Sequence, residues 1–188
     1  MEASSIARAT LVAGLTVFAT CVAAQTDTNT RMDEGTKKMM KSADMTFAMK
    51  AAQGGMAEVE MGKLAADKGT NPDVKAFGQH MVDDHTKAND DLKSTAAKVG
   101  ATVPTNLNAK DQAEYNKLQR LSGPAFDHEY VRDMVRDHEE DVKEFQKEAN
   151  NGQDTDIKSF ATRTLPVLEE HLSRIKSVQS SMQGGASK

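Results

Sequence analysis

Three histidines of this chain, His85, His138 and His171, fall on the apolar faces of three different predicted helices. A fourth predicted helix carries a carboxylate, Glu58, on its own apolar face. Polar side chains are costly to bury without a partner, so one such residue on each helix needs a physical explanation. Imidazole and carboxylate groups together are suitable ligands for a transition metal such as Zn, Fe, Cu or Mn. These residue types predict a single metal ion inside a helical protein.

The second ring nitrogen of a metal-bound histidine usually donates a hydrogen bond to an acceptor. Candidates for this role that lie near the histidines in the sequence are Asp84, Tyr130, Asp137 and Asp141. Asp141 lies one helical turn after His138, so we expect Asp141 to orient that ring.

Two other hypotheses fit the same residues. In the first, the chain is a non-catalytic structural or interaction module, and the inward histidines form a hydrogen-bonded polar layer of its core. In the second, it is a metal-dependent oxidase or peroxide-handling enzyme with Tyr130 near the metal, which would need an open coordination position. No residue pattern identifies a substrate, so a binding or stress-related protein is favoured over an enzyme.

Four long helices are predicted to position these side chains, because apolar residues recur at alternating spacings of three and four. They cover about residues 41–68, 72–99, 124–149 and 155–182. Asn71 and Asp154 are expected N-caps, and Pro72 suits a first helical position. A shorter apolar segment after Asn108 predicts an extra helix in the crossing between helices two and three. The predicted fold is therefore all-α, an antiparallel four-helix bundle with one short additional helix.

The helical rise tests whether the polar residues share one layer. Counted from the turn that joins their helices, Glu58 and His85 differ in depth by about 4.5 Å. His138 and His171 differ by about 7.5 Å, which requires helix tilt or a kink at Pro166 to bring them together. The pair Glu58 and His85 is therefore the better matched.

The N-terminus has the features of a signal peptide. Arg8 precedes an apolar run over residues 11–19, and the small residues Val22, Ala23 and Ala24 follow at the position that signal peptidase requires. We expect cleavage after Ala24 and a periplasmic or secreted protein with no membrane span. Lipidation at Cys21 is the weaker alternative. The remaining predicted parts are a disordered leader over 25–40, a helical domain over 41–182 and a flexible tail over 183–188.

Charge and cysteine content narrow the class of protein further. The chain has 24 Lys and Arg residues against 28 Asp and Glu, a net charge of −4, and its basic residues are not clustered. This argues against a nucleic-acid partner. The one cysteine lies in the expected signal peptide, so the exported chain would have no disulfide.

Several short stretches are similar to one known family. They are Ala51–Glu60, Met81–His85, Phe126–Tyr130 with His138, and Leu165–His171. Over about residues 41–180 the chain resembles the exported bacterial proteins of domain-of-unknown-function family 4142, which is grouped with the ferritin-like bundles. The resemblance implies a ferritin-like fold and export, and it implies no activity.

The chain departs from the di-iron ferritin-like proteins. Those proteins use Glu residues from two helices and Glu-x-x-His motifs from the other two. Here the residues three positions before the histidines are Val82, Val135 and Leu168. Iron oxidation is therefore not expected, and a site for one metal ion fits the residues better.

Overall fold

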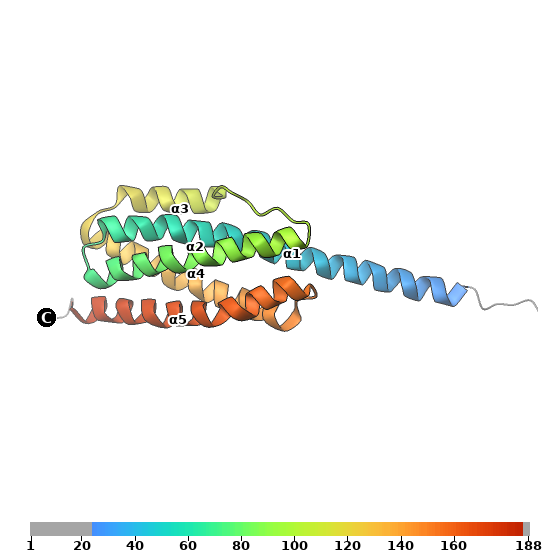
Figure 1. Ribbon diagram of the computed structural model, residues 1–188. Coiled ribbons are helices and arrows are strands. Elements are labelled where there is room, and N and C mark those ends of the chain that lie inside the picture. The colour runs from blue at the N-terminus through green and yellow to red at the C-terminus, as the bar shows by residue number, and fades with distance from the viewer. Residues whose placement is uncertain (1–23, 186–188) are drawn as a thin grey trace, which may run out of the picture. The chain divides into compact units, whose positions relative to one another are not determined.

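A computed structural model describes residues 24–185, all of whose regular elements are α-helices (Figure 1). These are α1 (Ala24–Lys68), α2 (Pro72–Lys98), α3 (Ala109–Arg120), α4 (Gly123–Asn151) and α5 (Thr155–Gly185). The predicted all-α class is thus confirmed, and α3 is the short helix expected in the crossing. The expected signal peptide falls outside the described residues except for Ala24, as do residues 186–188 of the expected tail.

The start of α1 differs from the expected leader over residues 25–40. The structure has helix from Ala24 onward, and residues 25–40 are part of α1. The segment contains no proline, and its Met and Lys residues favour helix even without an apolar repeat. The C-terminal helix is also longer than predicted, because α5 continues to Gly185. The absence of periodicity was therefore a poor guide to helix ends.

The predicted helix caps are present. The Oδ1 atom of Asn71 accepts a hydrogen bond from the backbone N–H of Asp73 at 2.8 Å, with Pro72 as the first residue of α2. Asp154 Oδ1 accepts from the backbone N–H groups of Asp156 and Ile157 at 3.1 and 3.2 Å. These bonds satisfy N–H groups that lack a partner within the helix, and they fix where α2 and α5 begin.

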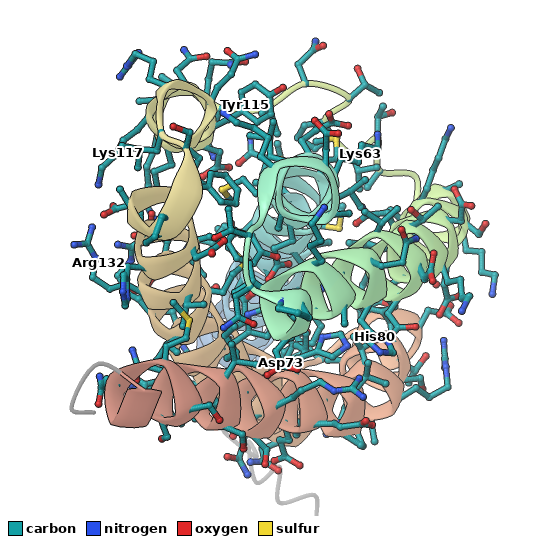
Figure 2. The ribbon with its side chains drawn as sticks, turned by 90° about the vertical axis from the view of Figure 1, so that its left-hand side faces the viewer. Lys63, Asp73, His80, Tyr115, Lys117 and Arg132 are labelled. Atoms are coloured by element: carbon teal, nitrogen blue, oxygen red, sulfur yellow. The ribbon has the colours of Figure 1, made fainter. Side chains whose placement is uncertain are left out.

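Residues from Thr36 onward form one compact unit. Within it, α5 packs against both α4 and α2, and α3 packs against α4. Helices α1 and α2 lie close together at Gly62 and Gly78. A Cβ atom added to Gly62 would lie only 2.8 Å from the carbonyl oxygen of Gly78. The end view in Figure 2 labels Lys117 of α3 and Arg132 of α4, whose side chains both pair with Glu129.

The apolar interior consists of two clusters, and the predicted polar residues lie between them. One cluster includes Met61, Met81, Met134 and Ile175, and the other includes Ala52, Leu92, Phe145 and Leu168. In each of the four helices, the inward polar residue lies in sequence between a member of one cluster and a member of the other. Glu58, His85, His138 and His171 thus form a buried polar layer that separates the two clusters.

Candidate metal centre

The three histidines meet in the interior from three different helices, α2, α4 and α5. The ring of His85 lies 5.8 Å from that of His138 and 5.4 Å from that of His171, measured between centroids. The His138 and His171 rings are also 5.4 Å apart. Their residues are only 5%, 0% and 3% exposed, respectively. The depth mismatch calculated for His138 and His171 therefore does not keep their rings apart.

One nitrogen of each ring has no hydrogen-bond partner within the described part of the chain. These buried atoms are Nε2 of His85, Nε2 of His138 and Nδ1 of His171. Each histidine also has one nitrogen that lies within 4.8 Å of a nitrogen of each of the other two. Three buried rings that each carry an unpaired nitrogen, and whose nitrogens come this close together, are what a metal-binding set of imidazoles requires.

The second nitrogen of each ring contacts an acceptor of the protein. His85 Nδ1 lies 3.0 Å from Oε2 of Glu58, and His171 Nε2 lies 3.1 Å from Oδ2 of Asp84. These two contacts hold the rings through carboxylates on α1 and α2. Carboxylate acceptors orient an imidazole and increase its basicity as a metal ligand.

The acceptor nearest to His138 is a backbone carbonyl of its own helix, not a carboxylate. Its Nδ1 atom lies 3.0 Å from the backbone carbonyl oxygen of Met134, one turn earlier in α4. Oε1 of Glu58 lies 3.4 Å from the same nitrogen. This carbonyl acceptor was absent from the sequence prediction, although a histidine on a helix always has the carbonyl four residues before it within reach.

The electrostatics favour uncharged His138 and His171. Burial lowers the pKa of His138 to about 4 despite the nearby Glu58 charge. Burial and the charge of His85 lower the pKa of His171. A neutral imidazole is the form that binds a metal, so these two rings are ready to act as ligands.

Glu58 and His85 form a buried ion pair. Burial acts to raise the pKa of Glu58, but the charges of His85 and His138 and the hydrogen bond from His85 outweigh it and lower this pKa to about 2. Burial acts to lower the pKa of His85, and the Glu58 charge outweighs it, so the pKa of His85 is raised. A metal that binds His85 must therefore displace a proton held by this pair.

The structure places Glu58 differently from the other three predicted ligands. Its carboxylate lies on the Nδ1 side of His85 and His138, whereas the unpaired nitrogens of those rings are the Nε2 atoms. Glu58 is deeply buried at 3% exposure, while the nearby Glu60 pairs with Lys63 at the surface. Glu58 therefore contacts two of the three rings at the nitrogen opposite the unpaired one.

The four predicted acceptors have different surroundings. Asp84 contacts His171, as given above, and Asp137 pairs with Arg136 at 3.2 Å. Asp141 forms no hydrogen bond with a histidine among the described residues and lines a cavity that Glu58 also lines. Tyr130 is fully buried and its hydroxyl has no hydrogen-bond partner among the described residues. Of the four, Asp84 is the one that the structure brings into contact with a histidine nitrogen.

Phe77 forms one wall of the polar layer. Its ring lies 6.1 Å from that of His138 and 6.3 Å from those of His171 and Tyr130. Phe77 is therefore a neighbour of both the Tyr130 phenol and two of the imidazoles. Burial and the charge of Glu58 raise the pKa of Tyr130, which keeps the hydroxyl protonated.

The sequence matches the model of DUF4142, a domain of unknown function, over residues 29–178. The chain belongs to the DUF4142 family. None of the curated proteins compared with it matches. No helix among residues 24–185 of this DUF4142 protein is long and apolar enough to cross a membrane.

Solved structures of other helical proteins resemble this DUF4142 chain in fold. A DUF305 fragment from Deinococcus radiodurans is 10% identical, with a TM-score of 0.65 over 74% of this chain and 96% of that one. A DUF305 protein from Streptomyces coelicolor, whose name presents it as secreted, is 15% identical, with a TM-score of 0.63 over 75% of this chain and 94% of that one. Identities this low support a common fold and carry no information about activity.

Proposed function

We propose that this DUF4142 protein binds one transition-metal ion through Nε2 of His85, Nε2 of His138 and Nδ1 of His171. The observation that carries the proposal is that the two nitrogens of each ring have different surroundings. One nitrogen contacts an acceptor of the protein and the other is buried and unpaired, and each ring has a nitrogen within 4.8 Å of a nitrogen of each other ring. Metal-binding histidines have this combination of a free inner nitrogen and an outer acceptor.

The distances require only a small contraction on metal binding. Three nitrogens within 4.8 Å of one another share a central point at most about 2.8 Å from each, and Zn–N bonds are about 2.0–2.1 Å long. Each ring must therefore move inward by less than about 1 Å. Side-chain rotation alone supplies such a shift. Three protein ligands also leave a fourth position for water or another small ligand.

Zn²⁺ and Cu²⁺ are the ions that we favour. Both bind imidazole well, and the order of affinities places copper above zinc for a nitrogen site of this kind. The negative charge of Glu58 behind His85 and His138 offsets part of the positive charge of the ion. In this proposal Glu58 acts through the rings and is not itself a metal ligand.

A metal-free polar layer is the competing function, and it leaves three buried nitrogens without partners. Each unsatisfied buried polar group costs about 1–3 kcal/mol. An enzymatic role is less well supported, because the cavity that His85 lines has a volume of only about 20 Å³. A cavity needs about 10–15 Å³ to hold one water molecule, so this one has room for about one water and for no substrate. We therefore propose a binding protein without a substrate pocket.

The proposal extends to the fold and the compartment. Helices α1, α2, α4 and α5 supply the polar layer, which is the arrangement of a ferritin-like four-helix bundle with α3 added at its side. Export is supported by the signal-peptide features of the N-terminal sequence. Both N-terminal sequencing of the mature protein and its recovery from the periplasm or medium would test export.

Metal analysis tests the proposal. The chain should be purified without a His tag, loaded with Zn²⁺ or Cu²⁺, dialysed and compared with a triple variant, His85→Ala, His138→Ala and His171→Ala. We expect about one ion per wild-type chain and none retained by the variant. Single variants of each histidine provide folded comparisons if the triple variant does not fold. Equal metal content in all folded proteins would refute the site.

A further inference from the structure

A second polar feature lies between α1, α3 and α4. It is a cavity of about 80 Å³. Its lining contains six acidic side chains and, among the described residues, Lys110 as its single basic one. The acidic residues are Glu58, Asp111, Glu114, Asp137, Glu140 and Asp141. None of the three histidines lines this cavity.

One oxygen atom of Glu58 lacks a hydrogen-bond partner at this cavity. Oε2 of Glu58 contacts His85, whereas Oε1 has no hydrogen-bond partner although the residue is 3% exposed. Nδ1 of His138 lies 3.4 Å from Oε1, and this nitrogen is already 3.0 Å from the Met134 carbonyl oxygen. A buried acceptor in this position is costly unless a donor or a cation satisfies it.

Asp141 is a second carboxylate that lines this cavity. It is half-buried, and no donor or cation within the described ranges pairs with it. Asp141 and Glu58 together line both this cavity and the smaller one beside His85, so the two carboxylates lie on the same internal space. The neighbouring Glu114 and Asp137 differ, because Arg136 pairs with them at 3.1 and 3.2 Å.

We propose that this cavity binds one hard divalent cation, Ca²⁺ or Mg²⁺, through Oε1 of Glu58 and the carboxylate of Asp141. Both ions prefer oxygen ligands, and Mg²⁺ commonly uses one or two carboxylates and several waters. The remaining acidic residues supply negative charge around the ion. This site differs in chemistry from the three imidazoles, which suit softer transition metals. It does not depend on metal binding by the histidines.

Sharing of Glu58 would connect the two sites. A cation on Oε1 competes with His85 and His138 for the negative charge of this carboxylate. Occupation of either site would then change the affinity of the other, and the effect must be reciprocal. When the cation is bound, Glu58 would hold the proton of His85 less strongly.

Isothermal titration with CaCl₂ and with MgCl₂ tests the proposal on the chelator-treated chain. We expect one site for at least one of the two ions, and about tenfold weaker binding in Asp141→Asn. Glu169→Gln, an exposed acid on α5, is the matched control and should bind as the wild type does. Glu140→Gln, at the mouth of the cavity, should weaken binding by about two- to fivefold and serves if Asp141→Asn does not fold.

His171→Ala separates this site from the histidine site. It removes one proposed transition-metal ligand whose other nitrogen contacts Asp84 and not Glu58. Ca²⁺ or Mg²⁺ binding should survive in this variant while Zn²⁺ binding weakens. Absence of one-site binding for both Ca²⁺ and Mg²⁺, or equal binding by wild type, Asp141→Asn and Glu140→Gln, would overturn the cavity site and leave the histidine site unaffected.

Discussion

Nδ1 of His85 lies 3.0 Å from Oε2 of Glu58, and the Nε2 atom of the same ring has no hydrogen-bond partner. In the ion pair both nitrogens of His85 hold a proton. Because the carboxylate retains the proton on Nδ1, the proton that a metal displaces is the one on Nε2. In our proposal Glu58, which the sequence predicts to be a ligand, instead orients a ligand. Several measurable consequences follow from this pair and from its surroundings.

Glu58→Gln should weaken Zn²⁺ binding by about 10- to 100-fold. Glutamine keeps the shape and an acceptor for His85, but it removes the charge that raises the basicity of the ring. Competition with a chromophoric chelator measures the affinity. Glu60→Gln is the matched control, because Glu60 pairs with Lys63 outside the histidine site. Equal losses in both variants would contradict the role of Glu58.

Asp84→Asn should weaken Zn²⁺ binding by about 10-fold, the lower end of the range for an outer acceptor, because Asp84 is partly exposed. The residue contacts Nε2 of His171 at 3.1 Å. The same chelator competition applies. Asp83→Asn changes an exposed neighbour that bonds to Gln79 and should leave the affinity within about twofold. If Asp84→Asn bound zinc as tightly as wild type, the contact would have no part in the site.

Gly78→Ala should lower the free energy of unfolding by about 1–3 kcal/mol. A Cβ atom at this position would lie 2.7 Å from the carbonyl oxygen of Gly62, so α1 and α2 must separate. Gly54→Ala is the comparison, since its Cβ atom would meet nothing within 4 Å. That variant should gain up to about 1 kcal/mol from better helix propensity. Urea denaturation measures both, and a stable Gly78→Ala protein would argue against this helix contact.

Glu148→Gln should change how stability depends on pH. Burial, followed by the charge of Asp44 and a hydrogen bond with it, raises the pKa of Glu148 from 4.5 to about 7. Across that pH range the native state holds a proton that the unfolded chain releases, so the free energy of unfolding falls as the pH rises. Glutamine removes this loss and should stabilise the protein by about 1–2 kcal/mol above pH 7.

Thermal unfolding at several pH values between 4 and 8 would measure the effect. The difference in stability between Glu148→Gln and wild type should grow with pH and level off above the Glu148 pKa. Glu144→Gln serves as the control, because Glu144 is at the surface of the same helix and pairs with Lys50. A difference that stays constant with pH would mean that Glu148 titrates normally.

The helices and the polar layer could be predicted from the sequence because both depend on local spacing. Apolar periodicity assigned His85, His138 and His171 to inward faces, and Asn71 and Asp154 were recognised as caps by residue type and position. The segment 25–40 lacks the apolar periodicity that would predict helix, whereas α1 includes it. Periodicity reports which face is buried, and it does not report where a helix begins.

The roles within the site could not be predicted in the same way. Spacing brings Glu58 to the layer of the histidines, but the rotation of each ring decides whether a carboxylate meets Nδ1 or a metal. Asp141 is predicted to orient His138. The structure instead has the backbone carbonyl oxygen of Met134 in contact with Nδ1 of His138. Asp44 was not singled out, yet it accepts hydrogen bonds from the backbone N–H groups of Gln153 and Asp154. Such contacts join residues far apart in sequence.

The coordination shell of the metal-loaded protein tests the central claim most directly. X-ray absorption at the zinc edge, on protein loaded with one equivalent of Zn²⁺, should show three imidazole nitrogens at about 2.0–2.1 Å and one further light atom. His171→Ala should lose one imidazole from that shell. A wild-type spectrum without imidazole scattering, or one unchanged by His171→Ala, would contradict the three-histidine metal site.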